Sequence, residues 1–225
     1  MTGPAFRLEA RGLKKRFAVQ GRATTLLHGL SFQMRGGEIL CVLGPSGSGK
    51  SSLLALLAGI DTPDEGAILV NETPVHTMSA AAAAAWRSHT VGYLFQDAGL
   101  IERMSARRNV ELPLMYERLA PAVRREKALA ALGSVGVGHL AETPIDLLSG
   151  GERRRVAFAR VLAAPRPLLL CDEPTAGLDP HNAREVVRML LQQRDNGAAV
   201  VVATHDPVVA EAANAHITVP LAIAA

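Results

Sequence analysis

A glycine-rich segment at residues 44–52, GPSGSGKSS, constrains the fold more than any other part of the sequence. The apolar run EILCVL precedes it, and GKSSLLALLAG follows with the composition of a helix. The segment fits the pattern G-x-x-x-x-G-K-[ST], which in this strand–loop–helix context indicates a phosphate-binding loop. Gly44, Gly47 and Gly49 allow backbone N–H groups to turn toward phosphate oxygens. We therefore predict a strand, a phosphate-binding loop and a helix over this region.

The polar side chains of the loop define what it could bind. Lys50 can reach the β- and γ-phosphates of a nucleotide, and the Ser51 hydroxyl can ligate Mg²⁺. The N-terminus of the following helix adds about half a positive charge toward the anion. Kinases, GTPases, helicases and transport ATPases all use such a loop, so the loop alone leaves open what happens to the phosphate.

Short apolar runs elsewhere predict the strands of an α/β sheet. Each is rich in β-branched or aliphatic residues and ends at a polar or glycine-bearing turn: GPSG, QDAG, DEPT or THDP. Runs that are apolar throughout indicate parallel strands covered on both faces. Because ligands bind at the carboxyl ends of such strands, we expect the four turns to converge on one site. The runs are Ile39–Leu43, Val91–Phe95, Leu168–Cys171 and Ala199–Ala203.

The stretch between the second and third of these runs has a different character. It contains helical patterns at Ala120–Leu132 and Glu152–Ala163 and no convincing strand. A further surface helix is expected around Ala80–Ala85, since alanine is the best helix former. We therefore expect one domain over 1–225, with a catalytic core of residues 1–95 and 166–225 and an inserted helical subdomain of residues 96–165.

Two adjacent carboxylates follow the third strand, in the sequence PLLLCDEP. Asp172 at the end of a buried strand can hold Mg²⁺ directly or through water. Glu173 can act as a general base on a water in line with the γ-phosphate. The alternative role for Glu173 is to cap the turn that follows, and the spacing alone favours neither.

A second glycine-bearing helix start occurs in LLSGGERRRVAFARVL. The N–H groups of Ser149, Gly150 and Gly151 could bind phosphate. Because the first loop already binds the only triphosphate, a second such site suggests a nucleotide shared between two copies of the chain. The alternative is an ordinary capping box, in which Ser149 is the N-cap and Glu152 the third residue of the helix.

Composition narrows the class of protein. Among 225 residues, 48% are hydrophobic and 20% charged, so the chain can bury a sizeable core. The net charge is +3, and the only dense basic clusters are Lys14–Arg16 and Arg153–Arg155. We interpret both clusters as solvated faces, so no nucleic-acid partner is expected. No apolar run approaches the ~20 residues of a bilayer crossing, and the first residues lack the core of a signal peptide, so a cytoplasmic protein is expected. Cys41 and Cys171 lie in strand-like runs and are predicted to be buried, reduced thiols.

Six motifs in order give the chain a resemblance to a known family. They are GPSGSGKS, Gln96 after VGYLF, LSGGE, LLLCDEP, AGLD and ATHD. Over essentially its whole length the chain resembles the ATP-binding-cassette (ABC) family. The segment VGYLFQDAGLIERMSARRNVELPLMY is most similar to ATP-binding subunits of the lipoprotein-releasing, macrolide-exporting and cell-division type. The resemblance implies an α/β fold: a phosphate-loop NTPase core with a mostly parallel sheet, an N-terminal antiparallel β region and the inserted helical subdomain.

The resemblance also implies roles for particular residues. Two subunits would close head to tail around two ATPs, each lying between Lys50 of one subunit and Ser149 of the other. Phe17 would stack on adenine, although an edge-strand or core role is the alternative. His205 would contact the γ-phosphate and Asp179 would cross the dimer interface. The implied catalytic residues are Lys50, Gln96, Glu173 and His205; the nucleotide-binding residues are Phe17, Gly44, Pro45, Ser46, Gly47, Ser48, Gly49, Lys50, Ser51, Ser52, Ser149, Gly150, Gly151 and Asp179; the Mg²⁺ ligands are Ser51, Gln96 and Asp172.

The function implied is that of an ATP-hydrolysing subunit that uses Mg²⁺ and drives a separate membrane protein. We expect a homodimer, or a heterodimer with a related subunit, peripheral on the inner face of the plasma membrane. An integral membrane permease would dock near Gln96–Leu114. The alternative is a force-transmitting or regulatory ATPase whose membrane partner moves no solute. The chain departs from the family in Glu152, where glutamine is common, in TAGLD, and in the ending NAHITVPLAIAA.

Overall fold

A computed structural model describes residues 6–19, 22–221 and 223–224, and the chain folds into two compact units. The first unit combines Met1–Val91 with Pro167–Ala225, and the second is Gly92–Arg166.

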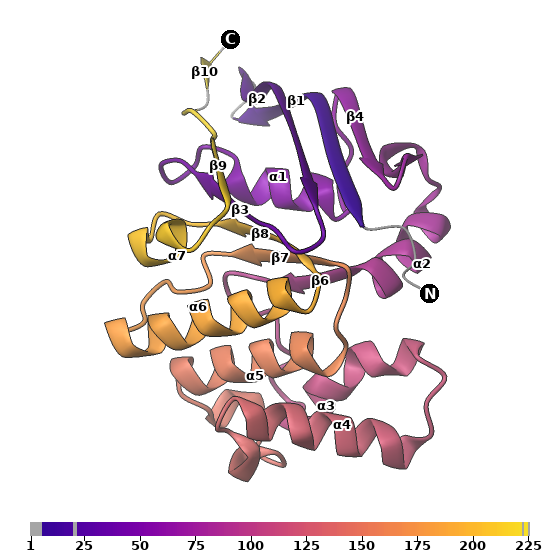
Figure 1. The fold of residues 1–225 in the computed structure, drawn as a ribbon, viewed down its shortest axis with the longest axis vertical. Coiled ribbons are helices and arrows are strands. Elements are labelled where there is room, and N and C mark those ends of the chain that lie inside the picture. The colour runs from indigo at the N-terminus through magenta and orange to yellow at the C-terminus, as the bar shows by residue number, and fades with distance from the viewer. Residues whose placement is uncertain (1–5, 20–21, 222, 225) are drawn as a thin grey trace. The chain divides into compact units, whose positions relative to one another are not determined.

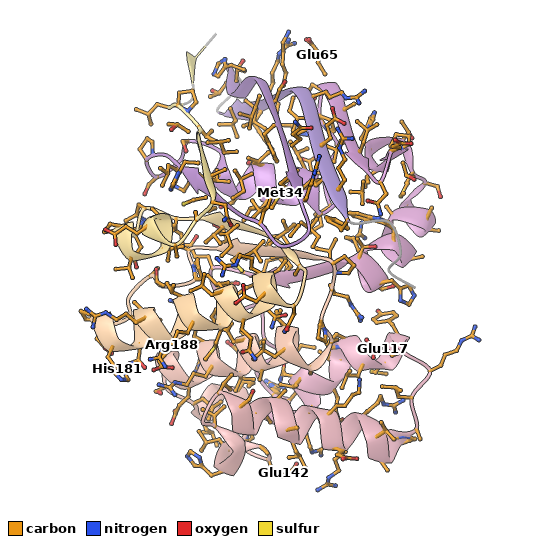
Figure 2. The ribbon with its side chains drawn as sticks, in the orientation of Figure 1. Met34, Glu65, Glu117, Glu142, His181 and Arg188 are labelled. Atoms are coloured by element: carbon orange, nitrogen blue, oxygen red, sulfur yellow. The ribbon has the colours of Figure 1, made fainter. Side chains whose placement is uncertain are left out.

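The first unit begins with an antiparallel sheet in the order β10-β2-β1-β4-β5. Register shifts interrupt the long β1–β2 pair between Ala10 and Leu13 and at two further points. One face of this sheet is apolar and buried: Leu8 and Leu13 on β1, and Met34, labelled in Figure 2, on β2. The antiparallel β region implied by the resemblance is therefore present. The bounds are β1 Arg7–Val19, β2 Arg22–Arg35, β4 Glu65–Val70, β5 Thr73–Pro74 and β10 Ile223–Ala224.

The same unit contains a parallel sheet in which β7, β8, β3 and β9 are neighbours in that order. Every residue of β7 and β8 is buried, as expected for strands that carry helices on both faces. Figure 1 shows α1 between this sheet and the antiparallel sheet, with α6 on the opposite face of β7 and β8. The bounds are β3 Ile39–Leu43, β7 Leu168–Asp172, β8 Ala199–Ala203, β9 Ala215–Thr218, α1 Lys50–Leu57, α2 Ala80–Thr90, α6 Pro180–Asp195 and α7 Pro207–Glu211, with a 3₁₀ turn at Val75–Thr77.

The second unit begins within β6, Val91–Leu94, and is otherwise mainly helical. Its helices α3, α4 and α5 pack against one another around buried Val110, Leu132 and Val156 (Figure 1). Among its described residues, pairing of the β type outside β6 is limited to an isolated bridge between Ser105 and Pro144. The bounds are α3 Ala106–Glu111, α4 Pro121–Ser134 and α5 Gly150–Ala163, with 3₁₀ turns at Leu112–Tyr116, Gly138–Leu140 and Ile145–Leu147.

Most predicted elements are present, with shifted ends. The strands β3 and β8 have the predicted bounds, whereas β6 ends one residue early and β7 includes Asp172. Helix α5 begins two residues earlier than predicted because Ser149 caps it, and α4 begins at Pro121, whose fixed φ suits a first helical position.

Both cysteines are buried and free, as predicted. Val202 of β8 pairs with each of them, so a whole strand separates Cys41 from Cys171. Burial, and secondarily the charge of Glu173, raises the pKa of Cys41 to about 11, and burial also raises the pKa of Cys171. These thiols are therefore protonated core side chains at neutral pH.

Within the described part of the chain, every helix is too short or too polar to cross a bilayer.

Candidate functional site

The loop between β3 and α1 is closed tightly by its glycines. Gly44 and Gly49 have φ angles of 155° and 100°, which side chains with a Cβ rarely adopt. A Cβ on Gly44 would collide with the Val219 carbonyl oxygen and lie 2.7 Å from the Ser48 hydroxyl oxygen. A Cβ on Gly49 would lie 3.0 Å from the Cβ of Leu26. The chain therefore requires glycine at both positions to form this loop.

Lys50, the first residue of α1, lies folded back over this loop. Its side chain is 7% exposed, and its Nζ donates to the carbonyl oxygens of Gly44 at 2.8 Å and Pro45 at 3.1 Å. Beside it, Ser48 Oγ is buried with no hydrogen-bond partner, the one such side-chain atom among the described residues. Because buried hydroxyls normally have a partner, this orphan and the adjacent ammonium fit a loop that receives an anionic group.

Asp172 at the end of β7 and Ser51 on α1 bring two side-chain oxygen groups together through a hydrogen bond. Burial raises the pKa of Asp172, a hydrogen bond from Ser51 opposes the rise, the charge of Glu173 adds to it and that of Lys50 opposes it. A carboxylate and a hydroxyl suit Mg²⁺, which takes one or two protein oxygens and completes its shell with phosphates and water. In the described residues no group of three or more His, Cys, Asp or Glu side chains could hold a metal by itself. The donor set therefore fits Mg²⁺ carried in with a nucleotide.

Glu173 directs its carboxylate to three side chains from other segments. Oε1 lies 3.0 Å from His205 Nδ1 and 3.7 Å from Lys50 Nζ, and Oε2 accepts a hydrogen bond from Thr204 Oγ1 at 3.2 Å. The backbone of Glu173 has a φ of 46°, and its N–H donates to the Ala203 carbonyl at 2.8 Å. The carboxylate thus faces the phosphate loop rather than the turn that follows it.

The first unit therefore brings five of the predicted residues together: Lys50, Ser51, Asp172, Glu173 and His205. They come from the start of α1 and from the residues at or just after the carboxyl ends of β7 and β8. The turns that follow β3, β7 and β8 therefore meet at one place, as predicted for them from the sequence. A buried lysine, two carboxylates and a histidine at one strand edge can bind an anion and move a proton.

Two further predicted residues lie exposed on the first unit. The ring of Phe17 on β1 is 39% exposed and lies 5.2 Å from Lys15 Nζ, so it is not a core residue. Asp179 is the N-cap of α6, where Oδ1 accepts from the backbone N–H groups of His181 and Asn182. These bonds lower the pKa of Asp179, so its carboxylate is ionised at neutral pH.

Ser149, Gly150 and Gly151 start α5 in the second unit, and all three are exposed. Ser149 forms the capping box that was the alternative interpretation of this motif: its Oγ accepts from the backbone N–H of Glu152 at 3.4 Å, and the Glu152 carboxylate accepts from the Ser149 N–H. Glu152 Oε2 is the acceptor for both the N–H and the hydroxyl of Ser149, at 2.8 and 2.7 Å. These two bonds hold the pKa of Glu152 below its usual value.

Gln96 is exposed in the loop after β6, also in the second unit. Further along this loop the φ angles are positive, 65° at Ala98 and 54° at Gly99. Arg160 of α5 fixes the loop by donating to the carbonyl oxygens of Ala98 at 2.9 Å and Gly99 at 2.6 Å. The loop that carries Gln96 is therefore tied to α5, which also carries the glycine-bearing helix start.

The two basic clusters are paired rather than free. Lys14 and Arg16 both contact Glu65, labelled in Figure 2, and Lys15 contacts Asp61. Lys15 is buried, so the interpretation of Lys14–Arg16 as a solvated face is wrong at this residue. The interpretation of Arg153–Arg155 as a solvated face is wrong, because all three residues are partly buried. Their guanidinium groups are used by the fold: Arg153 donates to the carbonyl oxygens of Leu148 and Asp146, and Arg155 to that of Val135.

Two polar residues that are 0% exposed, Thr204 and Asn109, were not predicted from the sequence. Thr204, directly before His205, is fully buried and contacts Glu173. Asn109 of α3 is also fully buried, and its amide binds the loop at Ile101. A threonine that directly follows an apolar strand, and an asparagine inside an apolar helix face, are the signals that could have identified them.

Comparisons with known proteins agree on one family. The family model described as ABC transporter matches residues 27–176. The dimeric post-hydrolysis structure of the ATP-binding cassette MJ0796 bound to ADP and Pi is 30% identical, with a TM-score of 0.89 and 94% of each chain covered. A second dimeric structure of MJ0796, described as a bacterial ABC transporter cassette, is also 30% identical, with a TM-score of 0.89 over 95% of this chain and 94% of that one.

The cbiO1 protein of Clostridium perfringens, part of the ABC transporter complex cbiONQ, is 30% identical, with a TM-score of 0.80 over 94% of this chain and 83% of its own. The family match covers more than half of the chain and includes the phosphate loop and both carboxylates of the strand edge. The chain therefore belongs to the ABC transporter family, as one of its ATP-binding cassettes.

Proposed function

We propose that this cassette hydrolyses ATP to ADP and phosphate with Mg²⁺, and that closure of a dimer around ATP drives a separate membrane subunit. The observation that carries the proposal is the Glu173 carboxylate beside Lys50 and His205, at the strand edge that also forms the phosphate loop. A carboxylate in that place can accept a proton from a water that attacks the γ-phosphate.

The side chains of the first unit divide this work among them. Lys50 exchanges its two carbonyl partners for the β- and γ-phosphate oxygens, and the N–H groups of residues 44–52 bind the remaining phosphate oxygens. Ser51 and Asp172, with Gln96, would hold Mg²⁺, which neutralises phosphate charge. Glu173 takes a proton as the water oxygen bonds to the γ-phosphorus and the bond to ADP breaks. His205 holds the γ-phosphate.

A second copy of the chain would complete the site. Ser149, Gly150, Gly151 and Asp179 are exposed in the single chain, where a partner could reach them. The N–H of Ser149 would exchange its bond to Glu152 for one to a phosphate oxygen. The partner's nucleotide would lie at the start of α5, and Phe17 would stack on adenine. The dimeric form of the MJ0796 cassette with ADP and Pi supports this arrangement. We propose a homodimer, or a heterodimer with a related subunit.

The membrane partner would dock near Gln96–Leu114. Large apolar side chains are exposed there and directly after it: Ile101 is 48% exposed, Met115 62% and Tyr116 63%. A contiguous patch of exposed apolar side chains marks a protein contact, and we propose that these three belong to one. We propose that residues 96–165 form the helical subdomain that contacts a permease, that residues 1–95 and 166–225 form the catalytic core, and that the complex lies on the inner face of the plasma membrane. The membership of cbiO1 in the cbiONQ complex supports a role of this kind.

Replacement of the proposed base tests the reaction. We expect Glu173→Gln to bind ATP with near wild-type affinity, to turn over at least a hundredfold more slowly, and to form a stable ATP-dependent dimer. The physical reason is that every phosphate ligand remains while the proton acceptor is lost. Turnover is measured by phosphate release with MgATP, and dimerisation by analytical ultracentrifugation.

One control variant and one further test variant accompany this experiment. Glu211→Gln changes an exposed carboxylate at the end of α7 and should keep the wild-type rate. Lys50→Ala should abolish turnover by losing ATP affinity, which calorimetric titration measures. Hydrolysis by Glu173→Gln at the wild-type rate would remove Glu173 from the role of base.

A further inference from the structure

The two oxygens of the Glu173 carboxylate have partners of different kinds. Oε1 faces His205 Nδ1 at 3.0 Å and Lys50 Nζ at 3.7 Å, whereas Oε2 accepts only from Thr204 Oγ1, at 3.2 Å, among the contacts described. Both partners of Oε1 carry groups that bind phosphate, and the partner of Oε2 does not. The carboxylate is therefore asymmetric before any nucleotide binds.

The strand register brings Thr204 to this place. Asp172 of β7 pairs with Ala203 of β8, so that the residues that follow them, Glu173 and Thr204, leave the sheet side by side. The backbone N–H of Thr204 donates to the Val42 carbonyl at 3.1 Å, so its main chain is tied to the next strand as well. Thr204 is fully buried, with 0% of its surface exposed.

A second hydrogen bond sets the direction of the Thr204 hydroxyl. Its Oγ1 accepts from the backbone N–H of Asp206 at 3.0 Å, and the side chain of Asp206 in turn caps α7. With the oxygen occupied as an acceptor, the hydroxyl proton is free to point toward Glu173 Oε2. The hydroxyl is thus a donor fixed by its own surroundings.

The two side chains that contact Oε1 can move away from it, whereas the buried Thr204 cannot. The side chain of His205 is 73% exposed, and Lys50 ends a flexible four-carbon stem whose other contacts are the two loop carbonyls. Under the proposed function both turn toward phosphate oxygens when ATP binds. The Thr204 bond to Oε2 requires no such change.

We propose that Thr204 is a positioning residue for hydrolysis: its hydroxyl holds Oε2 of Glu173, so that Oε1 faces the attacking water and accepts its proton. The inference rests on the proposed function, in which Glu173 is the base. In the step, one O–H bond of water breaks and its proton passes to Oε1. The water oxygen bonds to the γ-phosphorus, and the electron pair of the broken P–O bond leaves with ADP.

The test compares Thr204→Val, which is nearly isosteric and lacks the hydroxyl, with Thr204→Ser, which retains it. We expect Thr204→Val to lower kcat at least tenfold, equivalent to about 1.4 kcal/mol, with KM for MgATP within twofold of wild type. Thr204→Ser should recover at least half of the wild-type kcat. If the valine variant does not fold, Thr204→Ala is judged by the same criteria.

A double-mutant cycle shows whether the effect passes through Glu173. In a Glu173→Ala background, measured by single turnover with excess enzyme, Thr204→Val should change the residual rate by less than twofold. In a His205→Ala background it should retain its tenfold effect.

Three results would overturn the proposal: a kcat for Thr204→Val within twofold of wild type, a serine variant as slow as the valine variant, or an undiminished effect in the Glu173→Ala background. A wild-type rate for Glu173→Gln is a separate outcome, because it refutes the base itself whatever Thr204 does.

Discussion

Asn109 offers a stability prediction that the structure makes quantitative. Its side chain is fully buried in α3, and Oδ1 accepts from the Ile101 N–H at 2.8 Å. Its Nδ2 donates to the carbonyl oxygens of Ile101 at 3.1 Å, Ser105 at 3.2 Å and Met104 at 3.4 Å. The amide therefore pins the loop that precedes α3 to the helix.

The expected cost follows from the number of hydrogen bonds lost. The Nδ2 group has two protons, so it makes at most two full hydrogen bonds to the three carbonyls, and Oδ1 makes a third. At about 1 kcal/mol for each bond, Asn109→Ala should lose about 3 kcal/mol of unfolding free energy. In a chain of this size that corresponds to a fall in Tm of about 6–12 °C.

The measurement is urea unfolding followed by far-UV circular dichroism, with hydrogen exchange of the amides of residues 101–105. Arg108→Ala is the matched control, because Arg108 is exposed on the same helix and its loss should cost less than about 0.5 kcal/mol. Asn109→Asp keeps the acceptor for Ile101 but faces three carbonyls with a carboxylate. It should therefore be at least as destabilising as alanine.

A loss of less than about 1 kcal/mol in Asn109→Ala would refute the hydrogen-bond account of this residue, as would an Asn109→Asp variant that is more stable than Asn109→Ala at neutral pH. An Ile101 amide that exchanges no faster in the alanine variant would refute it too, because that N–H has Asn109 as its acceptor.

Two further predictions follow from pKa shifts. Burial raises the pKa of Asp172, so the folded protein binds this proton more tightly than the unfolded chain does. The resulting gain in folding free energy is complete below the unfolded pKa of about 3.9, and it is lost as the pH rises through the folded pKa. Asp172→Asn should therefore raise the Tm of the nucleotide-free protein at pH 7–8 but not near pH 3.5. The variant should also lose the increase in Tm that MgATP gives the wild type. Equal Tm differences between variant and wild type at both pH values would contradict this. Glu152→Gln should keep the capping box but remove the carboxylate charge at the start of α5, and so tighten ATP-dependent dimerisation several-fold in sedimentation equilibrium; a weaker dimer would exclude this effect of the charge.

Local chemistry explains which parts of the site the sequence predicted. The phosphate loop depends on glycines, a lysine and a serine within nine consecutive residues, so its pattern is visible without a fold. The apolar runs that end at Asp172 and Thr204 are similarly local, and so the convergence of their ends was predictable. The burial of both cysteines followed from the same runs.

Other residues required long-range information. The partners of Arg153 and Arg155 are backbone carbonyls, which leave no mark in composition, and the run was therefore interpreted as a solvated face. The bonds of Asn109 likewise end on a loop whose path no local pattern defines. The start of α5 depended on the Ser149 cap, and that of α4 on Pro121 as its first residue, rather than on hydrophobic period.

The sequence by itself determined that this chain is an α/β protein with a phosphate loop and a carboxylate pair at a strand end, because each of those features is written in consecutive residues. Only the tertiary structure decided how the Glu173 carboxylate is held. Its partners Lys50 and Thr204 are far from it along the chain and meet it because β7 pairs in register with β8 and α1 begins beside them. Strand pairing joins residues that are far apart in the sequence, so no local pattern reveals it. As a result of this pairing, one oxygen of Glu173 contacts Lys50 and His205 and the other accepts from the buried Thr204 hydroxyl.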